Sequence, residues 1–311
     1  MIGLTLLVLT PPASGTFTGE NGRIAFARTV SGTEVVFTVR PDGSGLKRLT
    51  HLAPGVNAFW PDWSPNGRWV AYTRIGEEVQ THIFRIRRNG TDRQDLSKAS
   101  CPPETCSAEY EPAWSPDGER LAYTRETRPG GGTRIYIKDA DGANPKTLVP
   151  FRRHTRDFSP QWSPGGKRVV FVRWEIRRGY AIFVVRRDGT DRHRLTPWRL
   201  NATAPDWSPN GRWIVFSAGA TDAPSAVWLM HPSGGNRHPI TTSSGGTVTW
   251  GTGSFSPDGE RITAIQAEWN GAGSDPGPGD IYVLSKRGDI VGQLTQSPLD
   301  DSDPDWGPRP Q

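Results

Sequence analysis

Short runs rich in β-branched and aromatic residues alternate with turn-forming residues along almost the whole chain. The run Arg120–Arg125 follows the turn sequence Ser-Pro-Asp-Gly, and the run Ile135–Lys138 leads into Asp141-Gly142. Proline presets φ at one corner of such a turn, and glycine accepts the positive φ at its exit. No stretch repeats apolar residues at helical spacing between helix caps. The pattern predicts an all-β chain of short strands joined by tight hairpins.

One strand-turn-strand segment recurs along the chain. DWSPNGRWVAYTR begins at Asp62, and related segments begin at Ala113, Gln161, Asp206 and Ser254. The aromatic residue of the segment recurs at spacings of 51, 48, 45, 48 and 51 residues, at Trp63, Trp114, Trp162, Trp207, Phe255 and Trp306. Such a period is typical of propeller blades. We therefore predict four antiparallel strands per repeat, with the repeated aromatic side chain wedged between neighbouring blades.

The two ends of the chain complement each other. The C-terminal SDPDWGPRPQ contains only the first strand of a repeat, whereas ENGRIAFAR near the N-terminus matches only the second strand. We expect Pro304–Gly307 to pair with Gly22–Arg28, which removes open sheet edges. Six second halves of the repeat are present, the first starting at Val35 and the last at Asp280. The prediction is a six-bladed β-propeller that forms one domain over residues 20–308.

The charge balance is a mild basic excess, with a formal net charge of +5 from 37 Lys and Arg and 32 Asp and Glu. Small arginine clusters lie at Arg85–Arg88, Arg152–Arg156 and Arg173–Arg178. A nucleic-acid binder usually gathers basic charge on one face together with stacking aromatic residues. We interpret the arginines as solvated blade edges that charge protects from strand pairing, and we expect no nucleic-acid partner.

The two cysteines lie close together in the segment CPPETC, at Cys101 and Cys106. A zinc site would need two further ligands nearby, and none is obvious in the sequence. We expect a disulfide that closes one long loop, which implies an oxidising compartment.

The N-terminus agrees with export. MIGLTLLVLT is a short apolar run followed by small residues that resemble a cleavage region, although a basic start is missing. The run is too short to span a bilayer as a helix. We interpret residues 1–19 as a signal-peptide remnant or disordered leader, and we expect a periplasmic or secreted monomer without a transmembrane segment.

The recurrent W-S-P-[DN]-G and the later aromatic strand, D-G turn and Leu-Thr resemble the TolB-like six-bladed β-propeller family. The resemblance covers about residues 20 to 308. It implies an extracytoplasmic location and a channel mouth suited to binding. TolB proteins carry an α/β domain before the propeller that contacts an inner-membrane partner, and their propeller binds a peptidoglycan-associated lipoprotein. No such domain fits before Gly22, so a role in that system does not follow from the resemblance.

Candidate ligand-binding residues lie in the connections that precede each P-x-W segment, because these approach the channel and its long-loop rim. They offer stacking surface, carboxylates, an amide and positive charge, which suits a peptide or glycan ligand. The candidates are Trp60, Glu109, Tyr110, Glu111, His154, Arg156, Asn201, Trp250, Asp300 and Asp303. The alternative is that these residues line a hydrated channel without binding a ligand.

Catalytic signals are sparse. The chain contains no H-E-x-x-H, Walker loop, dinucleotide fingerprint or G-x-S-x-G elbow, so we assign no catalytic, cofactor-binding or metal-binding residue. The carboxylates of Asp300–Asp303 would suit Ca²⁺ or another divalent ion, but a capped loop explains them equally well. The favoured function is a non-catalytic binding or scaffold propeller that recognises a protein, peptide or glycan in the cell envelope. The alternative is a metal-assisted lyase or hydrolase acting on a carbohydrate or lactone in the channel.

Overall fold

The structure is a computed structural model of the full chain. It describes residues 18–310 except for 77–78, 99, 103–105, 128–131, 221–222, 244–245 and 272–276. The leader predicted for residues 1–19 therefore lies almost entirely outside the described residues.

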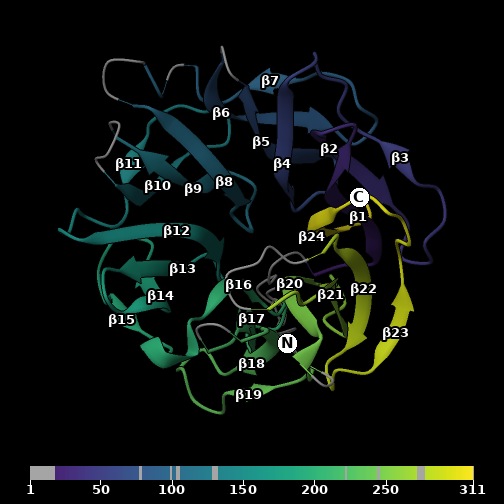
Figure 1. Cartoon of the computed structure of the whole chain (residues 1–311). Helices are drawn as coiled ribbons and strands as arrows, with labels where there is room; N and C mark the ends of the chain where they lie inside the picture. The colour runs from purple at the N-terminus through teal and green to yellow at the C-terminus, as the bar shows by residue number, and fades with distance from the viewer. Residues whose placement is uncertain are drawn as a thin grey trace, which may run out of the picture.

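The described chain is an all-β propeller in which small antiparallel sheets surround a common centre (Figure 1). One four-stranded sheet joins the two ends of the chain, in the order β24 (Asp301–Pro308), β1 (Asn21–Val30), β2 (Thr33–Val39) and β3 (Lys47–Arg48). Three other four-stranded sheets follow the chain order. The first consists of β12 (Thr155–Trp162), β13 (Arg168–Glu175), β14 (Gly179–Arg186) and β15 (His193–Arg194), and the second of β16 (Thr203–Trp207), β17 (Ile214–Ala218), β18 (Ala226–Met230) and β19 (His238–Pro239). The third consists of β20 (Val248–Phe255), β21 (Arg261–Glu268), β22 (Asp280–Ser285) and β23 (Ile290–Gln293). The short 3₁₀-helix η1 (Trp198–Leu200) connects β15 to β16.

The remaining sheet has eight strands in two groups. The first group is β4 (Val56–Trp63), β5 (Trp69–Gly76), β6 (Val79–Arg87) and β7 (Gln94–Asp95); the second is β8 (Ala108–Trp114), β9 (Arg120–Glu126), β10 (Thr133–Asp139) and β11 (Lys146–Thr147). Within each group neighbouring strands are antiparallel. A single parallel residue pair, Thr81 with Ala108, joins the groups.

The predicted pairing of the chain ends is present. β24 runs antiparallel to β1, with Ile24 opposite Trp306 and Arg28 opposite Asp301. At Gly307 the backbone passes so close to Trp63 that an added Cβ would lie 2.3 Å from the indole Cγ. The other repeats have serine at the equivalent place, so glycine here allows the indole of the neighbouring sheet to pack onto the closing strand.

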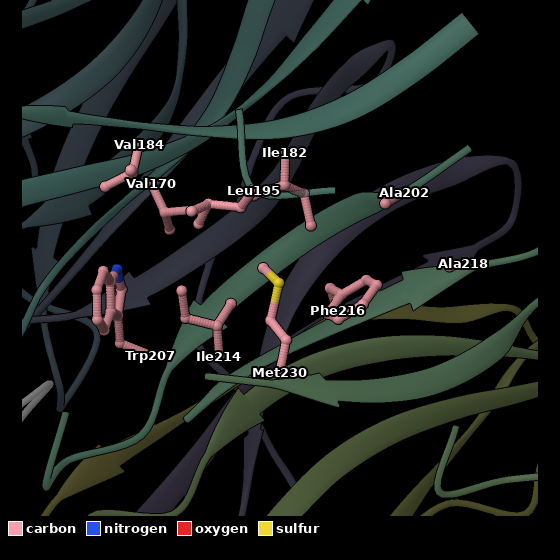
Figure 2. Packing of buried hydrophobic residues seen from close by; sticks show 10 residues of the cluster. All are labelled: Val170, Ile182, Val184, Leu195, Ala202, Trp207, Ile214, Phe216, Ala218 and Met230. Atoms are coloured by element: carbon pink, nitrogen blue, oxygen red, sulfur yellow. The ribbon is translucent and has the colours of Figure 1, made fainter. Parts of the chain in front are cut away.

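Apolar side chains fill the spaces between neighbouring sheets, as predicted for the repeated aromatic residue. Figure 2 shows one such cluster, in which Trp207, Ile214 and Phe216 of one sheet face Val170 and Ile182 of the preceding sheet. Trp63 packs in the same way against Ala25 and Val36. The strands carry apolar residues on both faces for this reason, since each sheet is covered on both sides.

The innermost strands differ from prediction in length. The sequence indicates only a short P-x-W-S strand, but β4, β8 and β12 begin seven, six and seven residues before their tryptophan. Each strand contains a register shift just before the tryptophan. The extra residues extend the strands along the channel and shape the site described next.

Candidate functional site

A cavity of about 200 Å³ lies at the centre of the ring. Residues of β4, β8, β12, β16, β20 and β24, the innermost strand of each group, line it. Five of the lining side chains are carboxylic acids: Asp62, Glu111, Asp206, Asp303 and Asp305. Among the described residues that line the cavity, there is no lysine, arginine or histidine. The centre of a chain with a net positive charge is thus strongly acidic.

A β-bulge aims side chains from these strands into the cavity. The residue before the proline of P-x-W has a positive φ of 46° to 52° at five positions, which are Trp60, Glu111, Ser159, Ala204 and Asp303. Such backbone is rare for residues other than glycine, and a residue before proline is also restricted. The register shifts in these strands coincide with it. Strained backbone of this kind is concentrated at functional sites.

Three aspartates that directly precede the repeated aromatic residue accept hydrogen bonds from the next sheet. Asp62 Oδ2 accepts from the Trp114 N–H at 2.7 Å, and Asp305 Oδ2 accepts from the Trp63 N–H at 2.7 Å. Asp206 Oδ2 accepts from the Phe255 N–H at 2.9 Å. Each carboxylate therefore satisfies a backbone donor of the next sheet along the ring, which fixes neighbouring sheets relative to one another.

The residue before the proline forms a second set of contacts. Glu111 Oε2 accepts from the Thr124 hydroxyl at 2.6 Å and from the Ser159 N–H at 2.8 Å, and Glu111 Oε1 accepts from the Ser159 hydroxyl at 3.0 Å. Asp303 occupies the equivalent position in β24, and its carboxylate interacts with the Trp60 N–H. Glu111 and Asp303 thereby link sheets and also line the cavity.

Burial raises the pKa of every cavity carboxylic acid. The pKa rises to about 8 for Asp206, about 7 for Asp303 and about 6 for Asp305, from an ordinary value of 3.8. Burial followed by repulsion from Asp305 raises the pKa of Asp62 well above that value, and burial raises the pKa of Glu111. The common cause is desolvation, which disfavours the charged form. Several of these groups therefore change charge between pH 6 and 8.

The structure brings three of the ten predicted ligand-binding residues into the cavity lining: Trp60, Glu111 and Asp303. Tyr110 packs on Trp60, with ring centroids 5.6 Å apart. Asp300 is exposed and lies near Glu34 and Asp303. Its charge contributes to raising the pKa of Glu34, and the charge of Glu34 contributes to raising the pKa of Asp303. His154 and Arg156 are exposed residues outside the lining.

Two of the other candidates, Glu109 and Trp250, are buried side chains with contacts inside the protein. Glu109 is fully buried and accepts from Lys138 Nζ at 2.5 Å and from the Ser100 hydroxyl at 2.8 Å. Trp250 is 5% exposed and packs in an apolar cluster with Val227 and Leu229. These two side chains are buried and are not part of the cavity lining, so the structure does not bring them together with Trp60, Glu111 and Asp303.

The side chains of Asn201 and Asp300 link neighbouring sheets through hydrogen bonds. The side-chain oxygen of Asn201 accepts from the Tyr180 N–H at 3.1 Å, and that of Asp300 accepts from the Gly279 N–H at 2.8 Å. Asn57 does the same for the Glu34 N–H at 2.8 Å. These polar residues therefore satisfy backbone donors of the preceding sheet.

The sequence interpretation missed Asp62, Asp206 and Asp305. They directly precede the repeated tryptophan in the P-D-W segments, whose pattern is typical of a buried strand. The available signal was chemical: an ionisable residue repeated at three positions of an apolar inner strand needs partners or a function.

Cys101 and Cys106 form a disulfide with Cα atoms 4.9 Å apart. Both cysteines are buried, and Gln80 Nε2 donates to the Cys106 carbonyl at 2.7 Å. The bridge lies beside the buried Glu109–Lys138 pair. Ser100, the residue directly before Cys101, contacts both of these charged groups.

The model of the TolB beta propeller domain matches residues 104–274, which is more than half of the chain. The chain belongs to the TolB β-propeller domain family. The match agrees with the resemblance inferred from the repeated W-S-P-[DN]-G segments.

Curated relatives of this TolB-family propeller include two proteins described as Tol-Pal system protein TolB. The one from Thioalkalivibrio sulfidiphilus is 27% identical over 131 residues, which cover 40% of this chain and 28% of that protein. The one from Alcanivorax borkumensis is 31% identical over 83 residues, which cover 27% of this chain and 18% of that protein. The matched segments thus span less than a third of either relative.

Among solved structures, TolB from Acinetobacter baumannii is similar in fold, with a TM-score of 0.70 and 18% identity. The likeness covers 93% of this chain and 67% of that one. The described residues contain no helix long and apolar enough to cross a membrane.

Proposed function

We propose that this chain is a non-catalytic, extracytoplasmic binding module whose channel mouth receives a cationic group of a protein partner. A lysine or arginine side chain or an N-terminal amine has the required charge. The observation that carries the proposal is the set of five cavity carboxylates with no basic residue among the described lining.

Electrostatics supports a cationic ligand. The carboxylates are desolvated and repel one another, so their pKa values are raised. A cation placed among them would offset both effects and would favour the ionised forms. Attraction between complementary charges also increases the rate of encounter and discriminates against acidic partners.

The sheet pairing supports a count of six blades. The eight-stranded sheet contains two P-x-W strands, β4 and β8, and a single residue pair joins its two halves. Counting each half as one blade gives six groups of four strands. The disulfide supports a location outside the cytoplasm, in the periplasm or as a secreted protein, because such bridges persist in oxidising compartments.

Capture from a cell-envelope fraction tests the proposal. The wild-type protein is compared with a Glu111→Gln plus Asp303→Asn variant, in which two cavity charges are removed and each side chain keeps one acceptor oxygen. A Glu119→Gln plus Asp141→Asn variant is the matched control, because both residues are exposed and outside the lining. We expect a protein partner that the wild type and the control retain and the cavity variant loses. Equal retention by all three would show that the cavity does not bind the partner.

The alternative function, a metal-assisted lyase or hydrolase, stays a prediction. Carboxylate oxygens are suitable ligands for hard divalent cations, and the cavity offers five such groups. Elemental analysis of the purified protein, together with thermal unfolding in Ca²⁺ and Mn²⁺, distinguishes the two. A bound divalent ion in stoichiometric amount would favour the alternative.

A further inference from the structure

Basic charge is concentrated in one part of the chain. Residues 151–200 contain 13 Lys and Arg and four Asp and Glu, whereas the rest of the chain contains 24 and 28. This segment has a formal charge of +9, and the remainder has −4. The segment corresponds to the sheet β12–β15 with the two connections that flank it, here called the basic blade.

The basic side chains extend over the exposed parts of this blade, from one rim to the other. At one rim, Lys167 lies in the turn between β12 and β13, and the Arg187 N–H donates to its carbonyl at 3.0 Å. Arg194 lies on the outermost strand, β15. Exposed arginines at the opposite rim are Arg152, Arg153, Arg156, Arg177, Arg178 and Arg199. β13 has eight residues, so the distance between rims is about 26 Å.

The acidic residues of the blade are already engaged. Asp157 forms a buried pair with Arg173 at 2.6 Å, and Glu175 lies 3.6 Å from Arg178. Asp191 pairs with Arg168 at 3.4 Å, and Asp188 lies 3.7 Å from Arg186. Within the described part of the chain, Arg152, Arg156, Arg177, Arg187, Arg194 and Arg199 have no carboxylate within 4.0 Å. Their guanidinium groups are therefore available to an anionic ligand.

Aromatic rings are interleaved with these arginines. Arg156 lies over Trp174 at 5.8 Å, and Arg178 and Arg194 lie over Trp198 at 5.9 and 5.6 Å. Phe151 is 61% exposed at the start of the segment. A guanidinium that rests on a ring is held in place, so less rotamer freedom is lost when it binds.

We propose that the basic blade binds an anionic polysaccharide lying across its outer edge from rim to rim. Arginine forks match carboxylate and phosphate groups in a bidentate manner. An extended row of such forks on one blade fits a polymer with repeated charges better than a single small anion. The surface is separate from the acidic cavity, so this proposal does not depend on the function proposed for the channel.

The compartment favours a glycan over a nucleic acid. The Cys101–Cys106 bridge indicates an oxidising environment outside the cytoplasm. Anionic polysaccharides are abundant there, whereas DNA and RNA are not the ordinary polyanions of that location. Nucleic-acid binding is accordingly an outcome that the test must be able to reveal.

The test compares two variants of equal charge. In the first, Arg152→Gln, Arg178→Gln and Arg194→Gln remove three exposed charges from the basic blade. In the control, Arg88→Gln, Arg212→Gln and Arg287→Gln remove three exposed charges from other sheets. Binding to immobilised alginate is measured at low and high salt, with neutral dextran and double-stranded DNA as comparison ligands, and thermal unfolding shows that all proteins are folded.

We expect wild-type binding to alginate but not to dextran, with affinity that falls as salt rises. The blade variant should bind at least about tenfold more weakly and lose about two to three from the slope of log affinity against log salt. The control should differ from wild type by less than about threefold. Equal losses in both variants, or no alginate binding by the wild type, would overturn the proposal. Tighter binding to DNA than to alginate at equal charge concentration would overturn the assignment to a glycan.

Discussion

At the scale of single residues, Gly307 allows the C-terminal strand to pack closely against Trp63 of the neighbouring sheet. A Cβ there would lie 2.3 Å from Trp63, a separation that normal packing does not allow. We expect Gly307→Ala to lower the free energy of unfolding by about 1–3 kcal/mol, because the indole or the strand must shift. Chemical denaturation measures this. Gly292→Ala is the control, since nothing lies within 4 Å of its added Cβ, and an equal effect of both substitutions would argue against the close contact.

Buried ion pairs are a second feature of single residues. Arg173 is 1% exposed and makes two hydrogen bonds to Asp157, at 2.6 and 2.8 Å. We expect Asp157→Ala to destabilise the protein by about 3–5 kcal/mol, because the guanidinium is left buried without its counter-charge.

The comparison residue for this pair is Asp191, whose contact with Arg168 is exposed. Asp191→Ala should change the free energy of unfolding by no more than about 1 kcal/mol. Similar losses for Asp157→Ala and Asp191→Ala would contradict the importance given to the buried pair.

At the scale of strands and sheets, the carboxylates beside the tryptophans hold neighbouring sheets together. Asp62→Ala leaves the Trp114 N–H without its acceptor and should destabilise the protein by about 1–3 kcal/mol. Asp62→Asn keeps an acceptor oxygen and removes the charge, so it should preserve more of the stability at neutral pH. If alanine and asparagine have the same effect in urea unfolding, the hydrogen bond is not what Asp62 contributes.

The strands also show how far sequence interpretation reaches. The repeated tryptophan and its turn were enough to predict the all-β propeller, the pairing of β24 with β1 and three cavity residues. They were not enough to distinguish Glu109 from Glu111, which are two residues apart and would share a face of a regular strand. The bulge between Tyr110 and Ala113 turns Glu111 to the cavity, while Glu109 pairs with Lys138 in the interior. A bulge of this kind depends on the backbone of the whole ring, and the residue pattern of a single strand does not predict it.

At the scale of the whole molecule, the cavity makes stability depend on pH. The folded-state pKa of Asp206 is raised to about 8 and that of Asp303 to about 7, both from 3.8. The folded protein therefore keeps protons that the unfolded chain has released, and this contribution to stability is full below pH 3.8 and lost as the pH rises to about 8. We expect the thermal midpoint to fall between pH 4.5 and 8.

Asp206→Asn provides the matched measurement for this dependence. The variant keeps an acceptor for the Phe255 N–H but has no proton to lose, so its thermal midpoint should vary less over the same pH range. A wild-type midpoint that rises steadily from pH 4.5 to 8, or an unchanged slope in the variant, would contradict the raised pKa values.

The charge distribution of the whole molecule has an acidic centre, which we propose receives a cationic group. Calorimetric titration of a trilysine peptide at pH 7 tests this proposal most directly. It compares the wild type, the Glu111→Gln plus Asp303→Asn variant and the Glu119→Gln plus Asp141→Asn control. We predict binding by the wild type and the control with release of protons, and affinity lower by about tenfold or more in the cavity variant, which corresponds to about 1.4 kcal/mol. Equal affinity in all three proteins, or no binding by the wild type, would contradict it.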